Sequence, residues 1–204
     1  MQELLQAKIS EHRSFGQSRL VGFDAKANPG KLNMASVGNG TMPHVAGELF
    51  NMMAGVNMVH VPYRGAPAAL TDLLGGQVQV YFATTAILIE HVRTGKLRAL
   101  AVTRAKRSEV LPDIATVSEF LPGFEASVWF GIGAPNNTPV DIVNKLNKLN
   151  KEINAGLAES QDQGAACGPG RPATFGLARR FGNHISAETE KWANVIRAAN
   201  IKPD

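Results

Sequence analysis

Short apolar runs alternate with helical stretches through residues 32–103 of this 204-residue chain, and glycine or proline stands at nearly every junction. The runs VHV and LRALAVT have no strict polar alternation, which is typical of strands covered on both faces. This βαβ rhythm predicts an α/β fold with a doubly wound, mostly parallel sheet and helices on both faces.

The glycine and proline residues at the junctions also indicate where the individual strands and helices begin and end. Thr41 is the expected N-cap of a helix that stops at Gly55, because threonine caps helix starts and glycine tolerates the left-handed conformation at helix ends. After Pro112 the rhythm changes, and residues 1–20 carry no clear pattern beyond one or two helical turns. We expect strands at 32–35, 56–61, 77–82, 97–103 and 124–132, a turn at 119–123, and helices at 41–53, 66–74, 87–93, 139–158 and 186–199.

Composition excludes several classes of protein. Hydrophobic residues make up 44% and charged residues 19%, which is ordinary globular composition and argues against disorder. The net charge of +4 is spread along the chain without aromatic interleaving, so nucleic-acid binding is not expected. A single cysteine, Cys167, excludes an internal disulfide and a cysteine-based metal cluster. No apolar run is long enough to span a bilayer, and the N-terminus does not have the apolar core of a signal peptide.

A glycine loop, Gly38-Asn39-Gly40-Thr41, joins the first predicted strand to a helix with Pro43 in its first turn. The unpaired N–H groups and the dipole of such a helix start favour an anion. Pro43 stands where a dinucleotide fingerprint needs its third glycine, so a nucleotide site is not expected. His44 follows in the first turn, where contact with a ligand and a structural capping role both stay open.

Three polar residues end neighbouring predicted strands: Ser36, Arg64 and Thr84. In open α/β sheets ligands gather at the carboxyl ends of strands, so these side chains are expected to converge there. Arg64 can bind a carboxylate in bidentate fashion, with a surface turn residue as the alternative. His60 lies within a strand and is expected to be a buried, satisfied histidine. No metal-ligand pair, nucleophile elbow or carboxylate pair accompanies them, so we expect no metal, no cofactor and no catalytic residue, as in a binding protein.

The chain closely resembles the tripartite tricarboxylate transporter solute receptors, the Bug (TctC-like) family of periplasmic binding proteins. The matching runs cover roughly two-thirds of the chain and read ANPGKLNMASVGNGTMPHVAGELF, VHVPYRGAPAALTDLLGGQV, GKLRALAVT, LPDIATVSEFLPGFEASVWFGIGAP and ETEKWANVIRAANIKPD. The resemblance implies a two-lobed, Venus-flytrap receptor (periplasmic-binding-protein type II-like) that closes on a di- or tricarboxylate, an acidic amino acid or an aromatic acid. It also implies that a membrane permease receives the ligand.

Carried onto this sequence, the resemblance places ligand contacts in three segments: the glycine loop and the two strand ends that follow it. Together with His44, the expected ligand-binding residues are Ser36, Gly38, Asn39, Gly40, Thr41, His44, Arg64, Gly65, Ala83 and Thr84. Family members often carry an aspartate at the position of Ala83, so this contact differs here.

Other departures concern whole segments. The family begins with a secretory signal and a first-lobe segment that are not seen in this chain, which we interpret as a truncated receptor. We expect an unmatched segment at 1–20, a complete ligand-binding second lobe at 21–128, and a return into an incomplete first lobe at 129–204. A compensated frameshift at 161–183 explains the Gly/Ala/Pro/Arg-rich stretch there better than a flexible loop does. Family resemblance indicates a periplasmic location, whereas the missing signal leaves a cytoplasmic one open. The alternatives are a degenerate product that binds nothing and a small α/β enzyme using the same cleft.

Overall fold

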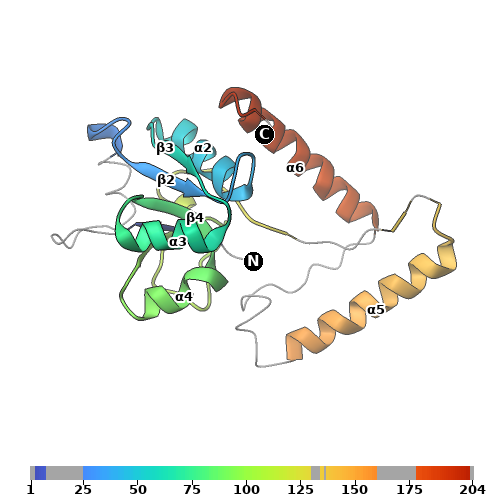
Figure 1. Cartoon of the computed structure of the whole chain (residues 1–204). Helices are drawn as coiled ribbons and strands as arrows, with labels where there is room; N and C mark the ends of the chain where they lie inside the picture. Colours follow the sequence, from blue (N-terminus) through green and yellow to red (C-terminus); the bar gives the residue numbers. More distant parts are fainter. Residues whose placement is uncertain (1–2, 8–24, 130–133, 136, 160–177, 203–204) are drawn as a thin grey trace.

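A five-stranded sheet organises the chain in the computed structural model, which describes residues 3–7, 25–129, 134–135, 137–159 and 178–202 (Figure 1). Its strand order is β3-β2-β4-β1-β5. The strands are β1 (Glu3–Ala7), β2 (Asn33–Ser36), β3 (Val59–Pro62), β4 (Val80–Thr84) and β5 (Arg98–Val102). The helices are α2 (Met42–Ala54), α3 (Ala66–Gly75), α4 (Thr85–Arg93), α5 (Val140–Glu159) and α6 (Ala178–Ala198), with a short 3₁₀ turn at Val117–Glu119.

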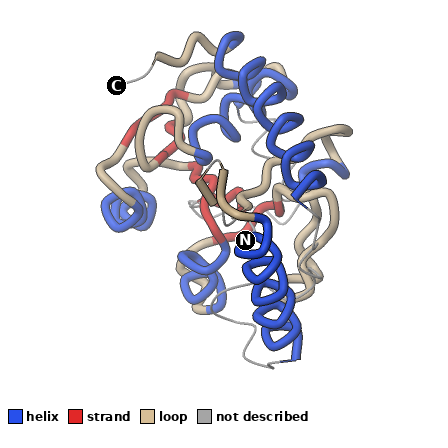
Figure 2. Tube along the Cα trace, turned by 90° about the vertical axis from the view of Figure 1, so that its right-hand side faces the viewer, coloured by secondary structure: helices blue, strands red, loops and turns tan. Residues whose placement is uncertain are grey.

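The predicted α/β fold is confirmed, and its helices lie on both faces of the sheet (Figure 1). β2 runs parallel to both β3 and β4, as the βαβ rhythm predicts. Viewed from a direction turned by 90°, the strands lie together with helices around them (Figure 2). The predicted helices at 41–53, 66–74, 87–93 and 139–158 all form with shifts of one or two residues at their ends. Gly55 ends α2 in the left-handed conformation (φ 62°), as predicted.

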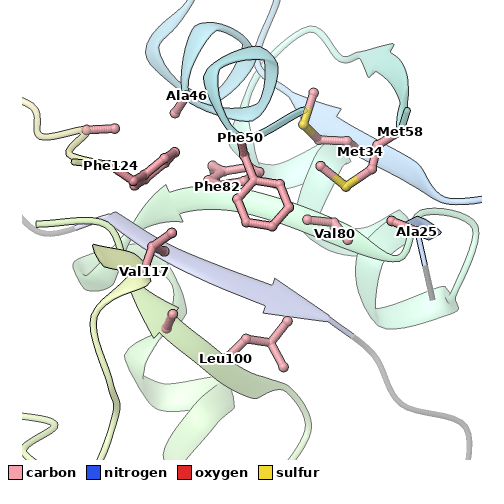
Figure 3. Packing of buried hydrophobic residues seen from close by; sticks show 12 residues of the cluster. Ala25, Met34, Ala46, Phe50, Met58, Val80, Phe82, Leu100, Val117 and Phe124 are labelled. Carbon is pink, nitrogen blue, oxygen red and sulfur yellow. The ribbon is translucent and has the colours of Figure 1, made fainter. Parts of the chain in front are cut away.

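Among the described residues, the two larger apolar clusters lie on opposite faces of the sheet. α2 covers the first, where Phe50 packs between Phe82 of β4 and Phe124 at ring-centroid distances of 6.0 and 6.2 Å (Figure 3). α3 and α4 cover the second, where Leu73 and Leu88 are fully buried. Burial of such side chains stabilises the fold by about 1.5–3 kcal/mol each.

The sequence missed β1. Residues 3–7 lie in the segment expected to be unpatterned, yet they insert between β4 and β5 and run antiparallel to both. The sheet is therefore mixed, and β4 and β5 are not neighbours. Five residues reading ELLQA fit a helical turn as well as a strand, so only the two flanking strands decide their conformation.

The strand predicted at 124–132 is wrong for its described part, because residues 124–129 form no strand. Ala126 N–H donates a single ladder-like hydrogen bond to Thr103 O at 2.9 Å. The predicted turn at 119–123 begins with the 3₁₀ turn at Val117–Glu119. The final helix is longer than expected, because it begins at Ala178 rather than Ser186, and the Ser186 hydroxyl donates to Gly182 O inside the helix. The rest of the expected frameshift and of the segment at 1–20 lies outside the described residues.

α5 carries exposed apolar side chains, among them Val140, of which 75% is accessible, and Leu149, of which 51% is accessible. Figure 1 shows α5 standing apart from the sheet, whereas α6 lies beside α2. None of the helices in the described part of the chain is long and apolar enough to cross a membrane.

Gly47 leaves room on α2 for the Met34 side chain of β2. A Cβ at this position would collide with Met34 Sδ and lie 2.5 Å from Met34 Cε, and Met34 is fully buried.

We therefore expect Gly47→Ala to lower the free energy of unfolding by about 1–3 kcal/mol, measured by urea denaturation followed by circular dichroism. Gly182→Ala is the matched control: its Cβ meets nothing within 4 Å in α6. It should stabilise by up to about 1 kcal/mol, because alanine is the better helix former. Equal effects of the two substitutions would contradict this account of the packing.

Candidate functional site

The carboxyl ends of β2, β3 and β4 meet at one edge of the sheet. The parallel register pairs Ser36 with Pro62 and Ala35 with Tyr81, so the loops that follow all three strands leave from the same side. Arg64 follows β3 by two residues, and Thr84 is the N-cap residue of α4. The topology therefore brings the three predicted strand ends to one edge.

The glycine loop between β2 and α2 is closed by its own hydrogen bonds. Gly38 and Gly40 have φ angles of 131° and 68°, which favour glycine. Gly38 N–H donates to Ser36 Oγ at 3.1 Å, and Gly40 N–H donates to His44 Nδ1 at 3.1 Å. Thr41 does not cap the helix through its side chain; its hydroxyl donates to Gly38 O at 2.6 Å. The two glycine amides that the sequence offered to an anion are thus already bonded to side chains.

Two histidine rings stack beside this loop. His44 of α2 and His60 of β3 have ring centroids 3.5 Å apart and planes 8° apart. His60 Nε2 and Ser36 Oγ share a hydrogen bond of 2.6 Å. On the other side, His44 Nε2 lies 3.8 Å from Glu48 Oε1, and Asn51 donates to the second carboxylate oxygen at 3.4 Å. Glu48 is thus partly buried and joins His44 and Asn51 in one network.

Burial sets the ionisation of the network. Desolvation lowers the pKa of His44. Desolvation, with the neighbouring His44 as a second cause, lowers the pKa of His60 to about 4. Burial raises the pKa of Glu48, partly offset by the hydrogen bond from Asn51. Both imidazoles are therefore neutral at neutral pH, which agrees with the acceptor role of His44 Nδ1.

The Ser36–His60 pair is not a nucleophile with its base. Ser36 is completely buried, and its Oγ already accepts the Gly38 N–H. A nucleophile must reach an incoming carbonyl, and this hydroxyl has no access to one. His60 has two partners, as expected of a satisfied histidine, but it is half-buried rather than buried.

The turn after β3 is tied down by Tyr63. Its N–H donates to Ser36 O at 3.0 Å, and its hydroxyl donates to Asp72 Oδ2 of α3 at 2.8 Å. Burial, followed by the hydrogen bond to Asp72 and its charge, raises the pKa of Tyr63 to about 12. Arg64 comes next and is exposed, and Gly65 (φ 119°) starts α3. The backbone of this turn is fixed, and the Arg64 side chain points into solvent-accessible space.

Ala83 does not present its side chain at the sheet edge. It is buried in the core beneath α3 and α4, packed with Tyr81 and Leu88. Of the residues expected to bind ligand, Asn39, Gly40 and Arg64 are exposed, whereas Ser36 and His44 are buried.

A pocket of about 270 Å³ opens beside the first turn of α2, and sequence reasoning missed it. Its lining residues are Met42, Ser127, Val128, Trp129, Glu188, Thr189 and Trp192. The chain contains only two tryptophans, and both line this pocket, which we call the tryptophan pocket. Their rarity was the available signal. Their proximity depends on α6 packing against α2, which no local pattern reveals. The described residues contain no group of three side chains able to hold a metal ion.

Acid should destabilise the fold through the histidine pair. An unfolded histidine binds a proton near pH 6.5, whereas His60 does so in the folded chain only near pH 4. Between these values the unfolded chain binds more protons, so the free energy of unfolding should fall as the pH falls through this window. Urea titrations across the window measure the slope, which should flatten in His60→Gln.

Glu48→Gln supplies the control of opposite sign. Since the pKa of Glu48 is raised, the folded chain takes up this proton before the unfolded chain does, and its carboxylate offsets part of the acid loss. Removal of the carboxylate in Glu48→Gln should therefore make the free energy of unfolding fall more steeply as the pH falls. A slope that neither substitution changes would contradict the role assigned to the network.

Comparison with known proteins places this site in context. Residues 20–161 match the family model described as tripartite tricarboxylate transporter family receptor. Protein BugT of Bordetella pertussis is 33% identical over 178 residues, which are 87% of this chain and 54% of that protein. The chain spans about half the length of the curated relatives that it matches first.

Two solved structures share the fold. The structure described as R. palustris Rpa4515 with adipate is 30% identical, has a TM-score of 0.79, and is matched over 100% of this chain and 67% of its own. MatC from Rhodopseudomonas palustris with bound malate is 27% identical, has a TM-score of 0.74, and is matched over 96% of this chain and 66% of its own.

Proposed function

Because the chain belongs to the tripartite tricarboxylate transporter receptor family, we propose that it is a solute-binding protein that holds a small carboxylate without changing it chemically. The observation that carries the proposal is the strand-end edge, where the loops after β2, β3 and β4 leave from one side of the sheet and the first turn of α2 begins. That turn offers the positive end of a helix dipole, which favours a carboxylate. The structures of Rpa4515 with adipate and MatC with malate support a dicarboxylate as the ligand.

Individual residues are assigned roles in holding the ligand. Arg64 is proposed to pair with one carboxylate group, since an exposed arginine after a strand end can contact both oxygens of a carboxylate. The proposed ligand contacts from the same edge are Asn39, Thr41 and Thr84. The loop is shaped by Ser36, Gly38, Gly40 and His44.

A periplasmic location and delivery to a membrane permease are proposed from family membership. The histidine pair favours no enzymatic alternative, because its serine is buried.

Binding is testable by fluorescence, because both tryptophans line the pocket. Adipate, malate and a tricarboxylate are titrated into the folded chain, with adipamide as the uncharged control for adipate. We expect a saturable change in emission and a matching calorimetric heat with at least one carboxylate and none with adipamide. A cooperatively melting sample that gives neither signal with any carboxylate would favour a degenerate product that binds nothing.

The role of Arg64 has a charge-matched control. Arg64→Gln should weaken carboxylate binding about tenfold or more, since a hydrogen bond to a charged group contributes about 1.5–3 kcal/mol. Arg93→Gln makes the same change in net charge on the last turn of α4, where Arg93 pairs with Glu90. It should leave affinity unchanged. Equal losses in both variants would point to net charge rather than a contact of Arg64.

A further inference from the structure

The histidine pair controls the shape of the glycine loop through two separate hydrogen bonds. His44 Nδ1 accepts the Gly40 N–H at 3.1 Å, and His60 Nε2 bonds Ser36 Oγ at 2.6 Å. Ser36 Oγ in turn accepts the Gly38 N–H at 3.1 Å. Each histidine therefore fixes one glycine of the loop, His44 directly and His60 through the serine.

The stacking of the rings couples these two bonds. With centroids 3.5 Å apart and planes 8° apart, neither ring can tilt without displacing the other. His44 comes from α2 and His60 from β3, so the stack also links the helix after the loop to the neighbouring strand. His44 Nδ1 must carry a lone pair to accept an amide proton, which places the ring proton on Nε2, 3.8 Å from Glu48 Oε1.

We propose that His44 and His60 are positioning residues that hold the loop 37–41 in one shape before any ligand arrives. In this arrangement Gly38 and Gly40 turn their amides inward, to Ser36 and His44, and the loop offers a ligand its outer side and the start of α2. A loop fixed in advance costs less conformational entropy on binding. The consequence for affinity rests on the proposed function, but the shape of the loop does not.

The test uses the difference in length between the side chains of asparagine and glutamine. The oxygen of an asparagine side chain can replace histidine Nδ1, whereas the oxygen of glutamine can replace Nε2. His44→Asn should therefore keep the Gly40 amide bonded and His44→Gln should not. At position 60 the order is reversed: His60→Gln should hold Ser36 and His60→Asn should not. Each pair differs by one methylene, so the two members are controls for each other.

Amide hydrogen exchange of assigned glycines, measured by nuclear magnetic resonance, reads the result. Gly40 should exchange about tenfold or more faster in His44→Gln than in His44→Asn, as loss of one hydrogen bond implies. Gly38 should show the same contrast between His60→Asn and His60→Gln. Equal protection of both glycines in all four variants would overturn the proposal.

The unmodified protein gives a second reading that does not depend on how well the variants fold. The imidazole ¹⁵N spectrum at neutral pH should show an unprotonated Nδ1 for His44. A protonated Nδ1 would overturn the proposal. The same four variants can then be titrated with the carboxylate that binds best. If no carboxylate binds the unmodified chain, the proposed function fails while the exchange data still decide the role of the histidines.

Discussion

The close packing of α2 on β2 is the constraint on which the site depends. Gly47 allows the helix to approach the buried side chain of Met34. His44 lies three residues earlier on the same helix, and residues three apart share a helix face, so His44 is carried down onto the sheet as well. There it meets His60, whose Cα pairs with Met34 across β2 and β3. The Gly47–Met34 contact and the histidine stack therefore lie next to each other on the same face of α2.

A second constraint is the burial of Ser36. A buried hydroxyl needs hydrogen-bond partners, and its partners here are His60, Gly38 N–H and Gly38 O. Satisfying the serine thus bends the loop back on the end of β2, and the loop amides turn inward. This changes the meaning of the glycine motif. The sequence suggested a loop that wraps an anion with its own N–H groups, whereas the structure shows a loop that supports the start of α2.

What the sequence predicted well is local. Gly55 and Gly76 stop helices because only a left-handed residue closes those turns, and βαβ periodicity needs no knowledge of distant contacts. The clearest failures are long-range. β1 forms only because β4 and β5 both pair with it. The histidine stack could not be predicted, because it depends both on the register of β3 against β2 and on which face of α2 lies against the sheet.

The tryptophan pocket shows why the C-terminal part of the chain matters to a site built on the sheet. Trp192 of α6 packs against the core beneath α2, and Lys191 Nζ donates to Glu125 O at 2.6 Å. Lys191 also lies 4.8 Å from the centre of the Trp192 ring, and Trp192 Nε1–H donates to Glu188 at 2.8 Å. Of these contacts, the bond from Lys191 to Glu125 O ties α6 to the segment that leads to residues 127–129, which also line the pocket. The pocket therefore exists only while α6 is docked, so any ligand that enters it also stabilises the attachment of α6 to the sheet.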